Sequence, residues 1–425
     1  MSDMLSNVQT NIDDNVIDFM SRTTGVKYSD EQLAILKQKG GMCILASAGS
    51  GKTTIMNHLI AKRIQTKEIE DPSKLLCTTF SKTGANEMGQ RLEQLLSQLG
   101  VRSKAHVKTL HAVYLQLLKD LGYSLNIVEN SSKMRYIREA CKEQGIHLED
   151  DEFQTLESIF GYQINNLLSD SDLFKSYAYT LREQIPLEKY SSIRQLFNNK
   201  KQIDGCMDFD DMQLFVYTLL KSPQYGAAIQ QYCHSLWQHI YVDEAQDVSK
   251  IQFEILKMLI SDPNKLVFIG DDDQCIYEWR GADPSIILNI CGVYTDLTLM
   301  KLTTNYRCKS NIVDKADIGI KFNRTRSDKT MTAYNKGGTI KVCDVGDGNI
   351  YSMSKYAYKY IKELIIDKGV SPNDIAVLSR NNQHLTILNN MLFKEGIYCN
   401  ATEDMKFTKC GIYRLIEGII QMGQN

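Results

Sequence analysis

The chain has 425 residues, of which 43% are hydrophobic, so it can bury more than one core and two or three domains are expected. Its formal net charge of −2 excludes a global basic field, and any site for a polyanion must be local. Eleven cysteines show no C-x-x-C pair or zinc spacing, and no long apolar run or secretory leader occurs. We therefore expect an intracellular, soluble protein with reduced thiols and no membrane partner.

Short apolar segments and helical patterns alternate near the start of the chain. MCILAS (42–47) precedes a helix expected from Gly51, and KLLCTTF (74–80) precedes another from about Lys82. This alternation is typical of βαβ units and predicts a parallel sheet. The polar, acidic segment before Asp30 has no such pattern, and disorder is expected there.

The pattern changes in the middle of the chain. Residues 112–204 carry amphipathic helical patterns only, which predict a helical insertion. Apolar strands return at QHIYV (238–242) and KLVFIG (265–270), and acidic residues follow each of them. We therefore expect the first sheet to resume after the insertion.

A second α/β region is predicted near the end of the chain. GGTIKVCDV (337–345) and DIAVLSR (374–380) have the composition of strands, and a helical pattern over 354–369 lies between them. The predicted fold is α/β, with a parallel-sheet domain over 1–111 and 205–290, a helical subdomain over 112–204 and a second, partial α/β domain over 291–425.

A glycine-rich loop, ASAGSGKTT (46–54), lies between an apolar strand and a helix. In that context backbone N–H groups at the helix start can wrap phosphates, with Gly49 and Gly51 allowing close approach. Lys52 would reach the β- and γ-phosphates, and the Thr53 hydroxyl would bind Mg²⁺. A chance glycine–serine turn is the alternative. The predicted phosphate-binding residues are Ala48, Gly49, Ser50, Gly51, Lys52, Thr53 and Thr54.

Two acids follow the strand in HIYVDEAQD (239–247). The carboxyl edge of a parallel sheet is where such folds bind ligands. Asp243 is predicted to hold Mg²⁺ together with Thr53, and Glu244 to orient or deprotonate an attacking water. The alternative is a helix start enriched in acids by the helix dipole.

Gln32 has two interpretations. SDEQ (29–32) has the pattern of a capping box, with Ser29 as the N-cap and Gln32 as its partner. A side-chain amide just ahead of a phosphate-binding loop can instead bind the edge of an adenine base. Both interpretations stay open.

Five further segments complete a recognisable series. VFIGDDDQCIYEWRGA (267–282) and LTTNYRCKSNI (302–312) follow the two motifs above, and TTFSKTGANEMGQRL (78–92), VKTLHAVY (107–114) and MDFDDM (207–212) lie between them. In this order the series resembles the superfamily-1A DNA helicases of the UvrD, Rep and PcrA kind. The resemblance implies RecA-like domains that bind ATP and Mg²⁺ and a helical insertion in the first of them.

The resemblance also implies roles for individual residues. Gln274 would sense the γ-phosphate, Arg307 would act as an arginine finger, and Tyr306 would stack on adenine. The acids of 271–273 would face the nucleotide, so that the stretch from 267 to 282 couples two sites. The residues implied to contact single-stranded DNA are Phe80, Thr109, His111, Tyr277, Trp279 and Arg280.

The chain departs from the family pattern in two places. Thr54 stands where the family usually has an arginine that packs on the base, and no segment resembles motifs V and VI. We expect an ATP-dependent DNA helicase or translocase, moving 3′ to 5′ on single strands or at single/double-strand junctions, in replication or repair. The alternatives are a truncated ATP- and DNA-binding module without unwinding activity, or a motor completed by a second chain. A P-loop GTPase is disfavoured because no N-K-x-D motif occurs.

Overall fold

The computed structural model describes residues 2–101, 106–176, 178–346 and 348–400, with side chains from residue 12 onward except those of 382 and 383. The chain divides into two compact units, Met1–Thr339 and Ile340–Asn425. Among the described residues, no helix is both long and apolar enough to cross a membrane.

A six-stranded parallel sheet forms the centre of the first unit, in the order β3-β2-β4-β5-β1-β6. Every residue of β1, β2, β4 and β5 is buried, as expected for a parallel sheet that helices cover on both faces. The predicted βαβ fold is confirmed. The strands are β1 Met42–Ala46, β2 Leu75–Thr78, β3 His106–Lys108, β4 His239–Val242, β5 Leu266–Gly270 and β6 Thr298–Leu302.

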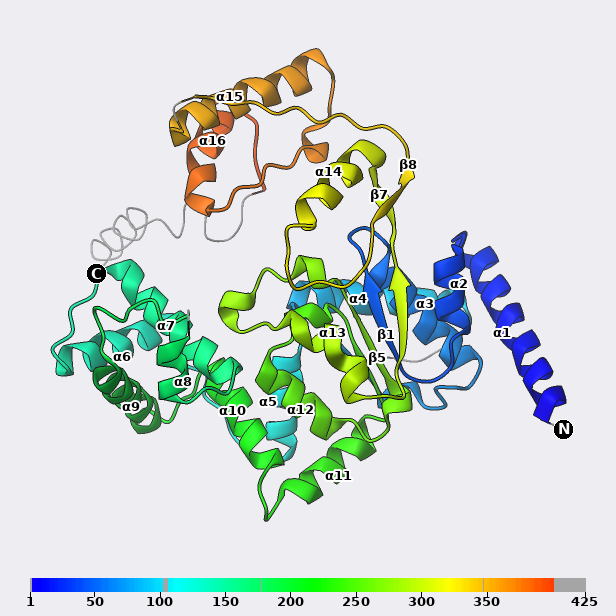
Figure 1. Cartoon of the computed structure of the whole chain (residues 1–425), viewed down its shortest axis with the longest axis horizontal. Coiled ribbons are helices and arrows are strands. Elements are labelled where there is room, and N and C mark those ends of the chain that lie inside the picture. Colours follow the sequence, from blue (N-terminus) through cyan, green and yellow to red (C-terminus); the bar gives the residue numbers. More distant parts are fainter. Residues whose placement is uncertain (1, 102–105, 177, 347, 401–425) are drawn as a thin grey trace, which may run out of the picture. The chain divides into compact units, whose positions relative to one another are not determined.

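Successive side chains of each strand point to opposite faces, so β1 contributes side chains to two separate cores. Met42, Ile44 and Ala46 pack with one set of helices, whereas Cys43 and Leu45 pack with the other. Figure 1 shows α2 and α3 on one side of the sheet and α5, α10 and α12 on the other. The first set is α1 Ser2–Thr24, α2 Asp30–Lys37, α3 Lys52–Gln65 and α4 Lys82–Gln98; the second is α5 Leu110–Asp120, α10 Phe209–Leu220, α11 Gly226–Leu236, α12 Lys250–Leu259 and α13 Pro284–Val293.

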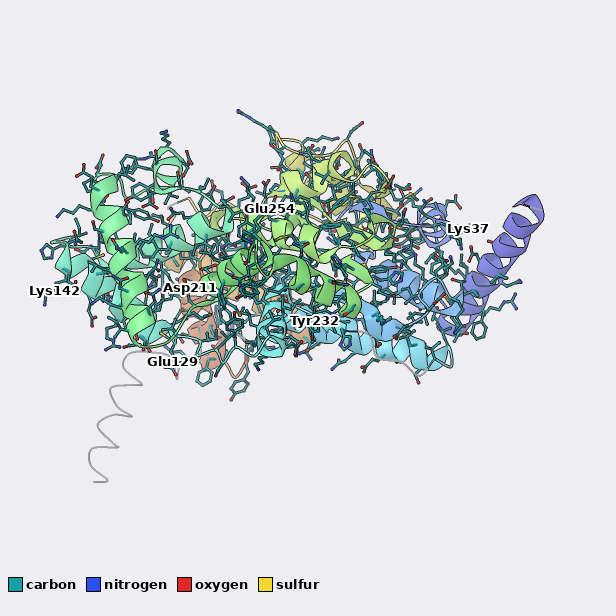
Figure 2. The ribbon with its side chains drawn as sticks, turned by 90° about the horizontal axis from the view of Figure 1, so that it is seen from below. Lys37, Glu129, Lys142, Asp211, Tyr232 and Glu254 are labelled. Atoms are coloured by element: carbon teal, nitrogen blue, oxygen red, sulfur yellow. The ribbon has the colours of Figure 1, made fainter. Side chains whose placement is uncertain are left out.

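The helical insertion has its own core. Tyr136, Ile159, Phe160 and Phe197 pack together away from the sheet. Its helices are α6 Asn130–Glu143, α7 Asp150–Asn165, α8 Asp170–Lys175 and α9 Leu187–Ile203. Figure 2 marks Glu129 and Lys142, which lie at the two ends of α6.

The predicted domain boundary at residue 112 falls inside α5 and is corrected. Val113, Tyr114 and Leu117 of α5 are buried in the same core as Met212 of α10 and Val242 of β4. This helix therefore belongs to the sheet domain, because its apolar face has its partners there.

The predicted boundary at residue 291 is also corrected, because β6 pairs with β1 over residues 298–302. The chain then leaves the sheet in β7 Thr304–Lys309, which pairs in parallel with β8 Thr332–Asn335, with α14 Ser310–Ile320 between them. The sheet domain therefore extends beyond the limit that the sequence indicated.

The described part of the second unit includes the α-helices α15 Ile350–Lys362 and α16 Asn382–Lys394, which share a small core of Ile361, Leu388 and Leu392. The strands predicted over 337–345 and 374–380 are wrong for the described residues, because neither segment has a hydrogen-bonded strand partner there. Val342 is 91% exposed and Leu378 is 93% exposed. A strand pattern in the sequence does not produce a strand without a neighbouring strand.

The disorder predicted before Asp30 is wrong, since α1 covers most of that segment. Ile17 and Met20 are buried against the sheet domain. Asp13 lies 3.0 Å from Lys62 Nζ and 2.5 Å from Lys39 Nζ, and Lys62 is completely buried. Asp13, which lies in the segment that the sequence predicted to be disordered, is thus the partner of a buried cation.

Asp13→Ala is expected to lower the free energy of unfolding by about 2 kcal/mol or more, because Lys62 loses one of two buried carboxylate partners. Urea unfolding measures the loss. Asp14→Ala is the matched control, since its pair with Lys37 is half-exposed and worth less than about 1 kcal/mol. Equal losses in the two variants would show that the buried pair of Asp13 contributes no more than the exposed pair of Asp14.

Candidate functional site

The glycine-rich loop connects β1 directly to α3. Gly49 and Gly51 have left-handed φ values of 67° and 84°, which glycine adopts without steric cost. A Cβ atom on Gly49 would lie 2.9 Å from the Asn305 side chain. Ser47 and Ser50 are buried and their hydroxyls have no hydrogen-bond partner among the described residues. These unpaired groups and exposed backbone at a helix start fit a phosphate ligand.

The residues predicted to surround the phosphates lie together. Lys52 Nζ is 3.4 Å from Glu244 Oε2, and the Thr53 side chain is hydrogen-bonded to Asp243. Burial raises the pKa of Asp243 to about 7; the charge of Glu244 adds to this effect and Lys52 opposes it. A buried carboxylate beside a hydroxyl is the oxygen-rich donor set that Mg²⁺ prefers, so Thr53 and Asp243 fit the ion.

Glu244 has an unusual backbone. Its φ of 51° places a non-glycine residue in the left-handed region, a conformation that costs free energy and that surrounding contacts must maintain. Gln246 supplies one such contact, since its Nε2 donates to Glu244 Oε2 at 2.9 Å and to Asp247 Oδ2 at 3.3 Å. Burial, followed by the charge of Glu244, also raises the pKa of Asp247 to about 7.

The three acids after β5 pair with two cations from the segment between α14 and β8. Lys329 Nζ lies 2.9 Å from Asp271 Oδ1 and 3.2 Å from Asp273 Oδ2, and it also pairs with Asp272. Arg326 binds both oxygens of Asp273 at 2.9 Å. The cluster could otherwise hold a metal ion, but two cations already compensate it. That these acids face a nucleotide stays a prediction.

A cavity of about 440 Å³ joins the two predicted sites. Gln274 lines it, and its Nε2 donates to Asp271 Oδ2 at 2.5 Å. Phe80 and Tyr277, which were predicted to contact DNA, line the same cavity and stack with ring centroids 4.5 Å apart. The other lining residues include Thr53, Asp243, Glu244, Gln246 and Asp247.

The NYR triplet lies beside the glycine-rich loop. Asn305 Nδ2 donates to the Ala48 carbonyl at 2.8 Å, and the Tyr306 backbone N–H donates to the Gly49 carbonyl at 2.9 Å. Arg307 is exposed, and the Tyr306 ring lies 5.1 Å from the ring of Tyr334. The triplet is thus brought to the phosphate loop from residues more than 250 positions away.

Of the two interpretations of Gln32, the capping interaction is present in the structure, and binding to an adenine base stays a prediction. The capping box with Ser29 is present, and Gln32 Nε2 also donates to the Ser50 carbonyl at 3.4 Å. Thr54, at the position where the family usually has an arginine, is exposed. The amide is therefore fixed against the loop by its capping role.

A second cavity, of about 920 Å³, extends from the sheet edge toward the helical insertion. Trp279 is half exposed and Arg280 lies over its ring at 4.7 Å. Thr109 caps α5 by accepting from the Ala112 N–H, and burial lowers the pKa of His111. All the residues predicted to contact DNA line this cavity: Phe80, Thr109, His111, Tyr277, Trp279 and Arg280.

Comparison with known families identifies this arrangement. The model of the UvrD/REP helicase N-terminal domain matches residues 28–294, more than half of the chain. The chain belongs to the UvrD/REP helicase family. The model of the UvrD-like helicase C-terminal domain matches residues 300–411. The RecA-like fold that the resemblance implied is thereby confirmed.

Curated proteins of this family are similar over most of the chain. A probable DNA helicase II homolog of Mycoplasma capricolum is 30% identical over 87% of the chain and 50% of its own length. The ATP-dependent DNA helicase PcrA of Bacillus subtilis is 27% identical over 89% of the chain and 50% of its own length. The putative ATP-dependent DNA helicase YjcD of Bacillus subtilis is 29% identical over 93% of the chain and 52% of its own length. The chain spans about half the length of these relatives.

Sequence reasoning missed four residues of the site. Gln246 lies inside the DEAQD motif and Asn305 inside the NYR motif, so their positions in the motifs could have indicated them. Lys329 and Arg326 follow the acids by more than 50 residues and belong to no recognised motif. Only the folded chain shows that they belong to the site.

The far wall of the larger cavity carries a buried acid, Asp210. Burial and then the charge of Asp208 raise its pKa to about 6, whereas Lys133 and a hydrogen bond from Asn165 act in the opposite direction. Asp211, the next residue, adds a smaller effect that raises the pKa further. The native state therefore holds this proton more tightly than the unfolded chain does.

The contribution of Asp210 to the free energy of unfolding should fall as pH rises from about 4 through about 6, because the unfolded chain loses the proton first. Asp210→Asn removes this fall. The free energy of unfolding of the variant, relative to that of the wild type, should therefore be higher at about pH 7.5 than at about pH 4.5. Urea unfolding at both pH values measures the gain, with the exposed Asp314→Asn as control. A gain that does not change with pH would contradict the assignment.

Proposed function

We propose that the chain hydrolyses ATP with Mg²⁺ and uses the reaction to move along single-stranded DNA as a helicase or translocase. The observation that carries the proposal is the shared cavity, in which Glu244 and Gln274 line the same space as Phe80 and Tyr277. A change at the nucleotide can therefore reach the aromatic residues without a long path. The printed names of the relatives support the same function.

Each part of the nucleotide site has a role in this proposal. The loop N–H groups and Lys52 bind the phosphates, and Thr53 and Asp243 would hold Mg²⁺, which would supply positive charge to neutralise the phosphates. Glu244 orients the attacking water and accepts its proton, and Gln274 contacts the γ-phosphate. Tyr306 stacks on the base and Arg307 stabilises the charge that develops on the transferred phosphate.

The DNA part of the proposal rests on the exposed aromatic surface. Aromatic rings accept any base, so Trp279 and Tyr277 can grip a single strand without reading its sequence. Thr109 and His111 supply polar groups for phosphates along the same cavity. We further propose movement from 3′ to 5′ and action at single/double-strand junctions in replication or repair.

ATP hydrolysis by this chain should rise when single-stranded DNA is added, and Lys52→Ala and Glu244→Gln should each lower turnover by about a hundredfold or more, because each removes a group that acts on the transferred phosphate or the water. Phosphate release measures this. Lys119→Ala, on the exposed side of α5, is the control. Retained ATP and DNA binding without turnover in the wild type would indicate a binding module instead.

Trp279→Ala should weaken binding of single-stranded DNA by about 1–3 kcal/mol, the contribution of one stacked base. Fluorescence anisotropy with a labelled oligonucleotide measures the affinity, which should also fall steeply with salt. Tyr225→Ala is the matched control, because Tyr225 is 54% exposed and Trp279 is 50% exposed. An equal effect in both variants, or binding that salt does not weaken, would exclude this cavity as the DNA site.

A further inference from the structure

Lys329 is the most buried cation in contact with the acids after β5. It lies between α14 and β8, and its side chain is only 2% exposed. Burial alone would lower its pKa, but Asp271 and Asp272 more than offset this effect and raise the pKa above its ordinary value. Lys329 therefore remains charged, and it fixes the side chain of Asp271.

Asp271 contacts two further side chains, Gln274 and Gln246. Its Oδ2 accepts a hydrogen bond from Gln274 Nε2 at 2.5 Å, so it orients the amide that lines the shared cavity. Its backbone N–H donates to Gln246 Oε1 at 2.9 Å. One aspartate thus contacts two glutamines that both line the cavity.

Gln246 completes the path to the nucleotide side. Its Oε1 accepts from Asp271, which leaves its Nε2 free to donate to Glu244 Oε2 at 2.9 Å. Glu244 Oε2 is in turn 3.4 Å from Lys52 Nζ. The path from Lys329 to Lys52 is therefore continuous: each contact between residues is a hydrogen bond or an ion pair, and within Asp271 it runs through covalent bonds from the carboxylate to the backbone N–H.

The local backbone is adapted to this path. A Cβ atom on Gly270 would lie 2.5 Å from Gln246 Oε1 and 3.0 Å from the Ala245 backbone nitrogen, so only glycine leaves room for the amide. Gln246 is 2% exposed, and no other orientation would satisfy both of its polar atoms as well. Glu244, held in the left-handed region, needs such support.

We infer that Lys329 is a positioning residue for nucleotide hydrolysis, acting through Asp271 and Gln246 on the orientation of Glu244 and through Asp271 on Gln274. The inference rests on the proposed function for its effect on turnover. The segment between α14 and β8 therefore affects the orientation of Glu244, the residue proposed to orient the attacking water. Nucleotide binding is not affected directly, because Lys329 contacts none of the loop residues.

The test compares Lys329→Met with Lys62→Met. Lys62 is equally buried and pairs with Asp13 and Glu68, but it has no hydrogen-bonded path to Glu244. Lys329→Met should lower kcat by about tenfold to a hundredfold with little change in KM for ATP, as expected when a supporting contact of a catalytic group is lost. Lys62→Met should lower the stability but leave kcat within about twofold.

A second readout does not depend on turnover. Hydrogen–deuterium exchange of peptides that cover 243–248 and 268–275 should become faster in Lys329→Met than in Lys62→Met, because the Asp271 N–H is released from Gln246. Unchanged exchange in these peptides overturns the inference. If the wild-type chain does not hydrolyse ATP, the proposed function is overturned. The comparison of exchange rates would still decide whether Lys329 positions Glu244 and Gln274.

The single substitution leaves three carboxylates with one cation and can impair folding. Asp272→Asn combined with Lys329→Met keeps the net charge of the cluster unchanged and still removes the contact with Asp271. This double variant should show the same loss of kcat and the same faster exchange. Wild-type kcat and exchange in the double variant would mean that Lys329 only balances charge. Recovery of kcat by Lys329→Arg, which keeps a cation at this position, would support the inference.

Discussion

The compensation of negative charge at one edge of the sheet is the constraint on which the site depends. Strands β4 and β5 are neighbours in parallel register, so Asp243 and Glu244 emerge beside Asp271 and its two following acids. Buried carboxylates this close together raise one another's pKa values and cost free energy unless cations lie among them. Lys52 supplies a cation on one side and Lys329 on the other.

The order of the strands explains why distant motifs meet. Strands β4, β5, β1 and β6 are neighbours in the sheet, in that order. The segments that follow them therefore leave the sheet side by side: the DEAQD acids, the acids after β5, the glycine-rich loop and the NYR triplet. Glu31 of α2 reinforces this edge, since its carboxylate accepts from the Thr303 N–H and hydroxyl just after β6. Asn305 then holds the loop carbonyl of Ala48. Parallel strands bring these groups together because all their carboxyl ends lie at one edge.

The two cavities have lining residues in common, among them Phe80, Glu244 and Tyr277. Gln274 and Tyr277 are three residues apart, yet one contacts an acid of the charge cluster and the other stacks on Phe80. A shift of the short segment between them therefore changes both sites at once. The buried, glycine-dependent packing at Gly270 limits how this segment can move.

The sequence alone determined the first sheet and the phosphate loop, because these features are local: a strand, a glycine loop and a helix start lie next to one another in the chain. The residues predicted to contact DNA came instead from the resemblance of several distant motifs to a known family, and Gln246, which lines the smaller cavity, was missed. It also predicted strands at 337–345 and 374–380, which need partners that no local pattern can supply. Only the tertiary structure decided that α1 provides Asp13 for Lys62 and that Lys329 occupies the acids after β5. Ion pairs between positions so far apart leave no periodic signal in a single sequence, so their pairing emerges only when the chain folds.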